Sequence, residues 1–257
     1  MAPQDIRRAG HEPRKYRRGV ALLPSILTVG NMFCGYACVL YAMRGHFYEA
    51  SPLIGIAMVL DTLDGRIARM TGTSSAFGIE FDSLADVISF GLAPAVLAFA
   101  WGLSELGRIG WAAGFVYVSA TAMRLARFNI QTAAQLDKRY FVGMPSPPAA
   151  GVIAATVFMF PYPLTGRALA LAALALTLVP AALMVSTIRF RSFKTLNLGY
   201  GPRYRLLVFA LIIALIWSWP AFWLMLLAYS YMISAFVELA INRWKARRET
   251  VPPAAAP

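Results

Sequence analysis

Long apolar segments alternate with short polar segments along most of this chain. A helix needs about 20 predominantly apolar residues to cross the hydrocarbon core of a bilayer. Counted in full, the pattern predicts eight transmembrane helices, at 22–43, 51–70, 78–101, 109–128, 147–162, 166–186, 204–219 and 220–241. The fifth and seventh of these segments are short or poorly marked, so a count of six or seven spans stays open.

The composition agrees with a protein embedded in a membrane. Hydrophobic residues make up 59% of the chain and charged residues only 14%, with a mean hydropathy of +0.59. This composition is far more apolar than that of an average soluble domain. The sequence therefore predicts an all-α integral membrane protein with about eight transmembrane helices.

The basic residues are distributed unevenly between the two ends of the predicted spans. If the loops between eight spans are assigned alternately to two sides, 21 of the 24 lysines and arginines fall on one side. The other side receives only Arg44, Arg108 and Arg167. Short loops rich in lysine and arginine face the cytoplasm. We therefore expect a multi-pass protein of the cell (inner) membrane with both termini in the cytoplasm.

This topology divides the chain into three parts. We expect a basic cytoplasmic segment at 1–20, one transmembrane domain at 21–243 and a cytoplasmic tail at 244–257. The net charge of +12 does not indicate nucleic-acid binding, because the basic residues lie between apolar segments and not along one face.

Four aspartates lie within the second and third predicted spans. They are Asp61, Asp64, Asp82 and Asp86, in the segment DTLDGRIARMTGTSSAFGIEFDSLAD at 61–86. An aspartate at the centre of a transmembrane helix costs about 2.5–3.5 kcal/mol on insertion scales. Such a cost indicates a functional site that handles a metal ion, a charged substrate or a proton.

The spacing of these aspartates predicts that they face one another. If the two helices form an antiparallel hairpin that turns near Gly72–Ser75, then Asp61 lies at the depth of Asp86, and Asp64 at the depth of Asp82. Residues three or four apart share one face of a helix. We therefore expect an acidic cup between the two helices that opens to the cytoplasm.

A divalent cation is the simplest way to compensate carboxylates that face one another. Oxygen ligands of this kind favour Mg²⁺ or Mn²⁺, which leave positions open for phosphate oxygens. Gly65 and Gly78 would let a phosphate approach the backbone, and Arg69 could bind it. The alternative role for both glycines is close helix packing.

The same segment resembles the signature of a known family. Its pattern D-x2-D-G-x2-A-R-x8-G-x3-D-x3-D is similar to that of the CDP-alcohol phosphotransferases, integral membrane enzymes of phospholipid synthesis. The resemblance implies a homodimer with six core spans around a polar cavity. It also implies metal binding by Asp61, Asp64 and Asp82, with Asp86 as general base. We include Asp86 among the possible metal ligands as well.

Further segments resemble one subgroup of this family, the membrane-integral phosphatidylserine synthases. They lie at 23–31, 81–95, 124–129, 141–151 and 183–194. The resemblance implies transfer of the phosphatidyl group from CDP-diacylglycerol to L-serine, with release of CMP, and two spans beyond the six-helix core. Thr28 and Asn31 then either bind the nucleotide or bond to neighbouring helices.

Serine would need a cation for its carboxylate and an acceptor for its ammonium group. The polar residues expected on the cytoplasmic side are Arg124, Arg127, Asn129, Arg189, Arg191 and Lys194. Of these we favour Arg127 and Arg189 as contacts for the carboxylate, with Asn129 and Lys194 as further contacts. The alternative is that these residues set the topology or touch anionic lipids.

Two other interpretations stay open at this point. The acceptor could be another alcohol, such as glycerol phosphate, choline or inositol phosphate. The chain could also be a cation or proton transporter that uses its carboxylates as a path. A phosphohistidine intermediate is disfavoured, because His11 lies in the N-terminal segment and His46 on the predicted outer side.

Overall fold

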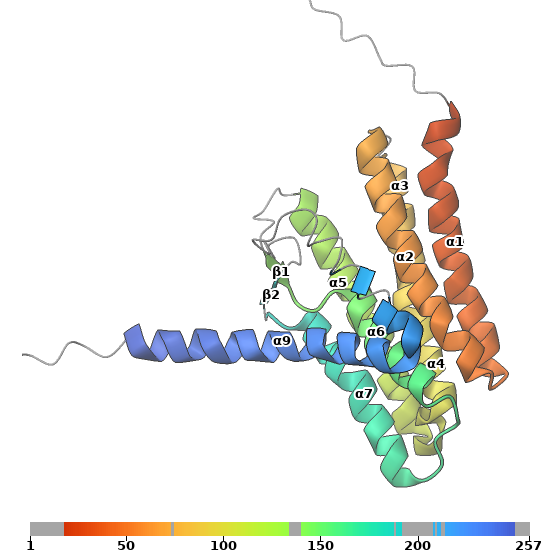
Figure 1. The fold of residues 1–257 in the computed structure, drawn as a ribbon, viewed down its shortest axis with the longest axis vertical. Coiled ribbons are helices and arrows are strands. Elements are labelled where there is room, and N and C mark those ends of the chain that lie inside the picture. The colour runs from red at the N-terminus through yellow and green to blue at the C-terminus, as the bar shows by residue number, and fades with distance from the viewer. Residues whose placement is uncertain are drawn as a thin grey trace, which may run out of the picture.

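The structure is a computed structural model, and it describes residues 18–72, 75–133, 140–187, 189–191, 208, 210–211 and 214–249. Its elements in chain order are α1 (Arg18–Met43), α2 (Phe47–Thr71), α3 (Ala76–Asp86), the π-helical segment η1 (Val87–Leu92), α4 (Ala93–Trp101), the short 3-10 helix η2 (Leu103–Leu106), α5 (Arg108–Ala133), β1 (Tyr140–Val142), α6 (Ser146–Met159), α7 (Arg167–Val185), β2 (Arg189–Arg191) and α9 (Pro220–Glu249). Most of these helices run along the long axis of the molecule (Figure 1).

Three of the described helical segments are long and apolar enough to cross a membrane. They are Pro24–Met43, Ala76–Trp101 and Arg167–Val185, close to three of the predicted spans. Helices α2 and α5 have the length, with 25 and 26 residues, but both contain charged residues that lower their apolar character. Helix α6 matches the fifth predicted span but has only 14 residues.

The outer surface of the bundle is also apolar. On α1, large hydrophobic side chains are exposed at Ile26, Val29, Phe33 and Leu40. Exposed apolar surface of this kind is typical of contact with lipid or with another protein. The structure is therefore consistent with an integral membrane protein.

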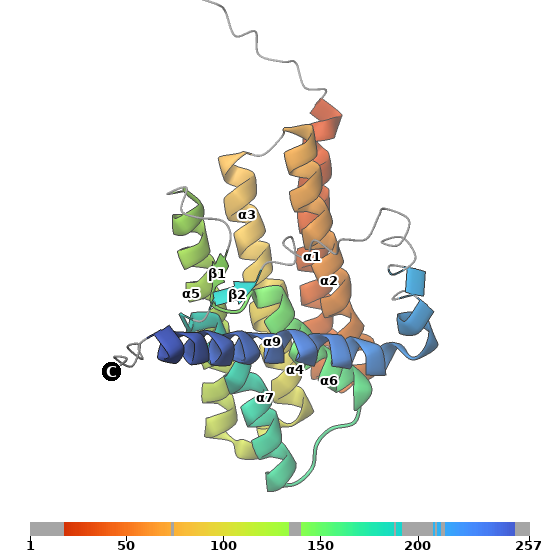
Figure 2. The ribbon, with the colours of Figure 1, turned by 60° about the vertical axis from the view of Figure 1, so that its left-hand side comes forward.

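The last two predicted spans are not seen as members of this bundle. Seven of the sixteen residues in the segment 204–219 lie outside the described residues. Helix α9 covers the span predicted at 220–241, but it lies across the other helices instead of alongside them (Figures 1 and 2). The apolar part among its described side chains, Pro220–Ser234, is shorter than a full span. The predicted count of eight spans is therefore not confirmed.

The turn between α2 and α3 lies where the sequence predicted it. Helix α2 ends at Gly72, which adopts a left-handed conformation with φ of 65°. Glycine is favoured there because it has no Cβ to strain this conformation. Ser75 begins α3, and its hydroxyl accepts a hydrogen bond from the backbone N–H of Gly78 at 3.0 Å. The two aspartate-bearing helices are thus antiparallel.

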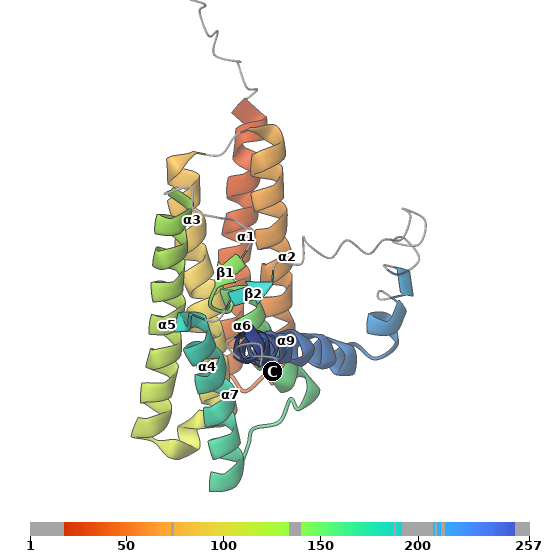
Figure 3. The same cartoon turned by 90° about the vertical axis from the view of Figure 1, so that its left-hand side faces the viewer.

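Helices α2 and α3 are held together by α1 more than by direct contact with each other. Helix α1 packs along α2 and also against α3, η1 and α4. Figure 3 shows α3 and α5 on one side of the bundle and α1 and α2 on the other. The two helices of the predicted hairpin are therefore splayed, and α1 packs against both of them.

A π-helical segment interrupts the third predicted span directly after Asp86. The sequence predicted one continuous helix at 78–101, whereas η1 separates α3 from α4. Pro94 lacks an N–H to bond to the carbonyl of Phe90, so the regular helical pattern cannot continue there. The backbone N–H of Ala93 instead bonds to the carbonyl of Ile88. Single π turns of this kind occur frequently at functional sites.

Two short strands depart from the all-α prediction. Strand β1, in the α5–α6 connection, pairs antiparallel with β2 after α7, with Tyr140 opposite Arg191 and Val142 opposite Arg189. Strands of three residues are too short for an alternating apolar pattern to predict them. The pairing fixes the α5–α6 connection against the end of α7.

Candidate active site

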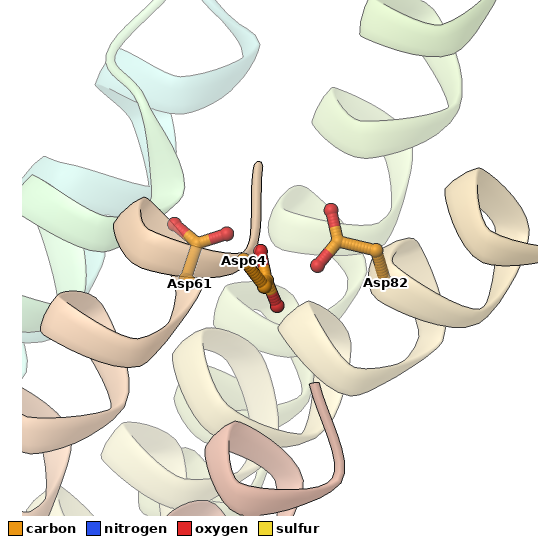
Figure 4. A group of neighbouring side chains, drawn as sticks. All are labelled: Asp61, Asp64 and Asp82. Atoms are coloured by element: carbon orange, nitrogen blue, oxygen red, sulfur yellow. The ribbon is translucent and has the colours of Figure 1, made fainter. Parts of the chain in front are cut away.

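Three carboxylates converge between α2 and α3. Asp61 and Asp64 come from α2 and Asp82 from α3, and one oxygen of each lies within 4.8 Å of the others (Figure 4). Asp61 and Asp64 are separated by three residues and so lie on one face of α2. The splayed arrangement of the two helices leaves room for the three side chains to point toward one another.

The surroundings of this cluster fit a divalent cation. Asp64 is buried, with only 3% of its surface exposed, and Asp82 has one buried carboxylate oxygen without a hydrogen-bond partner in the described structure. A buried carboxylate oxygen is costly unless a hydrogen bond or a cation compensates it. Mg²⁺ and Mn²⁺ bind to oxygen ligands of this type. The donor set is therefore chemically suited to the predicted metal.

Asp86 lies next to this cluster but is not one of the three converging carboxylates. Its side chain is buried and accepts a hydrogen bond of 3.2 Å from the amide of Asn31 on α1. It still interacts electrostatically with Asp61 and Asp82. The geometry thus separates Asp86 from the three residues best placed to share a metal ion, although the sequence analysis had included it among the possible ligands.

Helix α1 supplies polar partners for two of the four aspartates. The hydroxyl of Thr28 lies 2.9 Å from a carboxylate oxygen of Asp64, to which it donates, and 3.0 Å from the carbonyl of Pro24. Asn31, one turn further along, bonds to Asp86. In the structure both residues therefore contact acidic residues on neighbouring helices, the second of the two roles considered for them.

Asn31 is itself held in place by the π-helical segment. The hydroxyl of Ser89 donates a hydrogen bond of 2.9 Å to the backbone carbonyl of Asn31. The backbones of α1 and η1 lie so close together that a Cβ added at Gly35 would be 2.7 Å from the Cα of Ser89. A glycine is required for this approach, which fixes Asn31 opposite Asp86.

The predicted phosphate contacts occupy the C-terminal half of α2 and the start of α3. The guanidinium of Arg69 folds back over Gly65, 3.6 Å from where a Cβ would stand. Gly78 is partly buried in the first turn of α3, where Ser75 already accepts a hydrogen bond from its N–H. Neither glycine has a left-handed backbone conformation, and a Cβ at Gly78 would lie 3.2 Å from the hydroxyl oxygen of Ser75.

The predicted serine contacts are dispersed. Arg127 is exposed on α5, and the amide of Asn129 donates a hydrogen bond of 2.9 Å to the hydroxyl of Ser83, next to Asp82. Arg189 belongs to β2, where its backbone pairs with Val142. The fourth residue, Lys194, lies outside the described residues.

Among the three arginines of α5, Arg124 is partly buried, whereas Arg108 and Arg127 are exposed. The guanidinium of Arg124 interacts electrostatically with Asp61 and Asp86. It also donates a hydrogen bond to the hydroxyl of Ser146 at the start of α6. Helical spacing alone does not show which face of α5 meets the aspartates, so the sequence does not distinguish Arg124 from the favoured Arg127.

Comparison with known proteins identifies the family. The sequence model described as CDP-alcohol phosphatidyltransferase matches residues 21–188, a segment that includes all four aspartates. The chain belongs to this family. The resemblance inferred from the signature is thus confirmed, and membership in a family of transferases disfavours the transporter interpretation.

Several curated relatives share most of the chain. A protein of Helicobacter pylori named CDP-diacylglycerol–serine O-phosphatidyltransferase is 38% identical over 225 residues, which cover 87% of this chain and 91% of the relative. A Bacillus subtilis protein of the same name is 34% identical over 67% of this chain and 91% of its own length. The archaetidylserine synthase of Methanothermobacter thermautotrophicus is 35% identical over 65% of this chain and 69% of its own length.

Proposed function

We propose that this protein transfers the phosphatidyl group of CDP-diacylglycerol to L-serine and so produces phosphatidylserine and CMP. The observation that carries the proposal is the convergence of Asp61, Asp64 and Asp82 beside a fourth buried carboxylate, Asp86. This arrangement is built from the signature of a phosphatidyltransferase family. The names of the relatives favour serine as the acceptor over glycerol phosphate, choline or inositol phosphate.

The three converging carboxylates have the role of binding metal in this proposal. Mg²⁺ or Mn²⁺ held by Asp61, Asp64 and Asp82 would neutralise charge on the diphosphate of CDP-diacylglycerol during transfer. Arg69 lies on the same helix as two of these ligands and can bind a phosphate oxygen. Gly65 and Gly78 leave the backbone accessible at the same end of the site.

Asp86 has the role of general base. Its carboxylate accepts the proton of the serine hydroxyl while the serine oxygen forms a bond to the lipid-side phosphorus. The bond between that phosphorus and the bridging oxygen breaks, and CMP leaves with the bridging oxygen. This is a direct single displacement without a covalent enzyme intermediate. One oxygen of Asp86 accepts the hydrogen bond from Asn31, and we assign the other oxygen to the hydroxyl of the acceptor.

The acceptor assignment can be tested directly. Purified protein with Mg²⁺ or Mn²⁺ and CDP-diacylglycerol is expected to release CMP when L-serine is added, and much more slowly with glycerol phosphate, choline or inositol phosphate. The lipid product should contain serine in equal amount to the CMP released. If one of the other alcohols outcompetes serine, the chain has the same reaction class but a different acceptor.

The proposal includes the orientation of the site and the assembly of the chain. We infer that the site opens to the cytoplasm of the cell (inner) membrane and that the protein works as a homodimer, as the family resemblance implies. The end of α1 and the beginnings of α5 and α7 lie at the same end of the bundle (Figures 1 and 2). These ends contain Arg44, Arg108 and Arg167, the only basic residues assigned to the outer side. This clustering supports the orientation predicted from charge.

Thiol labelling tests the orientation. A cysteine introduced at Ser74, which follows the end of α2 in the sequence, should react with an impermeant reagent in inverted vesicles but not in intact cells. Ser104→Cys is the matched control, since Ser104 is exposed in η2 at the opposite end of the bundle and should react in intact cells. The native Cys34 and Cys38 are buried, so the background should be low. Labelling at Ser74 from outside would refute the predicted topology.

A further inference from the structure

A partly buried arginine lies beside the acidic site without a direct ion pair. Arg124 on α5 interacts electrostatically with both Asp61 and Asp86. Within the described part of the chain, however, its guanidinium bonds to Ser146 and makes no direct ion pair with either carboxylate. An arginine has five N–H donors in a rigid fork. Most of its donors are thus left for a group that enters between Arg124 and the carboxylates.

The surrounding structure holds this guanidinium in a defined position. Ser146, which accepts its hydrogen bond, is fully buried at the first turn of α6. The ring of Phe128, one turn along α5, lies 5.6 Å below the guanidinium carbon. A cation over an aromatic face is stabilised by the negative face of the ring. Arg124 therefore has a fixed orientation and is not a mobile surface charge.

Ser146 is in turn positioned by the residues between β1 and α6, because β1 is paired with β2. The N–H of Met144 donates a hydrogen bond of 2.9 Å to the carbonyl of Leu183 near the end of α7. Gly143 has φ of 86°, and a Cβ there would clash with the backbone carbonyl of Met184. The described part of this connection, from Tyr140 to Ser146, is therefore held against the end of α7, and the Ser146 hydroxyl lies against Arg124. Such preorganisation is typical of a binding group.

We propose that Arg124 binds the carboxylate of the amino-acid acceptor and thereby selects serine over alcohols without a carboxylate. This inference rests on the proposed function. A carboxylate matches the bidentate geometry of a guanidinium. In L-serine the carbon that bears the carboxylate is bonded to the carbon that bears the hydroxyl. A serine whose hydroxyl meets Asp86 therefore has its carboxylate within reach of a cation that also faces Asp86.

The sequence-based choice of Arg127 fits this role less well. Arg127 is exposed, three residues further along α5, and the structure brings Arg124 and not Arg127 to the side of Asp61 and Asp86. Contacts in water-exposed positions contribute little to specificity because solvent screens them. Arg124 lies in the partly buried region where a charge-assisted hydrogen bond discriminates more strongly between acceptors.

The test compares L-serine with ethanolamine, which has the same hydroxyl and ammonium groups but no carboxylate. Wild type, Arg124→Ala, Arg124→Lys and Arg127→Ala are assayed for CMP release, and the KM values for serine and for CDP-diacylglycerol are measured separately. Arg108→Ala is the control, since Arg108 is exposed at the other end of α5. Binding of CDP-diacylglycerol to each variant verifies that the site has folded.

We expect Arg124→Ala to raise the serine KM about tenfold or more, with the CDP-diacylglycerol KM changed less than about twofold. Arg124→Lys, which keeps the charge but loses the fork, should give a smaller rise. Any turnover of ethanolamine should fall much less than that of serine. If Arg124→Ala does not fold, Arg124→Lys is used instead. Its KM for serine should rise while its KM for CDP-diacylglycerol stays nearly unchanged.

Three results would overturn the inference. They are an unchanged serine KM in the Arg124 variants, an equal loss of turnover with serine and ethanolamine, and a rise in serine KM in Arg127→Ala instead. The second of these would mean that Arg124 only balances the charge of the aspartates. By contrast, a wild-type protein that binds CDP-diacylglycerol but releases no CMP with serine would overturn the proposed function itself.

Discussion

Replacing Asp86 with asparagine is expected to slow turnover at least about a hundredfold while leaving metal and CDP-diacylglycerol binding nearly intact. General-base assistance typically contributes about 10²–10⁴-fold to a rate, and an asparagine side chain cannot accept the proton of serine. The amide oxygen of an asparagine can still accept the hydrogen bond that Asn31 donates to Asp86. The substitution therefore removes the base with little change in shape.

Both quantities should be measured on the same preparation. Single-turnover CMP release reports the chemical step, and titration with Mn²⁺ and with CDP-diacylglycerol reports binding. Glu105→Gln is a suitable control, because Glu105 is an exposed acidic residue in η2 at the opposite end of the bundle. If Asp86→Asn loses Mn²⁺ affinity as severely as Asp64→Asn does, then Asp86 is a ligand and the base lies elsewhere.

The helices and the turn that form the acidic site followed directly from the sequence. The apolar runs that predicted spans near 22–43, 78–101 and 166–186 have strong, continuous signals, and the structure has apolar helices at these places. The turn at Gly72 was also predictable, because glycine followed by a run of small polar residues is typical of a helix end. Spacing on one helix face then brought the aspartates of each helix together.

The contacts from α1 could not be predicted in the same way. Helical periodicity shows that Thr28 and Asn31 share a face, but not which neighbour that face meets. Their partners, Asp64 and Asp86, are 36 and 55 residues away in the chain. The close approach of Gly35 to Ser89 and the π turn that contains Ser89 depend on the packed structure, so a single sequence gives no direct signal for them.

On α5 as well, the sequence does not show which neighbouring helix a given face meets, so it does not distinguish Arg124 from Arg127. The two arginines are three residues apart, so both are compatible with one face near the C-terminal end of the helix. Only the packed structure shows that the start of α6, fixed by Gly143 and the short strand pair, presents Ser146 to Arg124. The sequence therefore contains Arg124 as a candidate for selecting the acceptor, but it does not distinguish Arg124 from Arg127.

Removing the metal, or one of its predicted ligands, is expected to have the largest effect of all. Excess chelator should abolish CMP release, and Mg²⁺ or Mn²⁺ should restore it. Asp64→Asn and Asp82→Asn should each lower turnover by on the order of 10³-fold or more, because metal neutralisation of phosphate charge contributes several kcal/mol to such transfers. Asp64 is buried and bonded to Thr28, and Asp82 has an unpaired buried oxygen, so both are suited to bind a cation.

The matched control for these ligand variants is Glu80→Gln, an exposed acidic residue on α3 only two positions from Asp82. It removes the same charge from the same helix but should leave Mn²⁺ affinity and turnover close to those of the wild type. Thermal unfolding of each variant separates loss of metal from loss of fold. Because Asp61, Asp64 and Asp82 share one site, any two of the ligand substitutions combined should cost little more activity than one alone. Full activity in excess chelator, or strictly multiplicative losses in the double variants, would show that the three carboxylates do not act together on one ion.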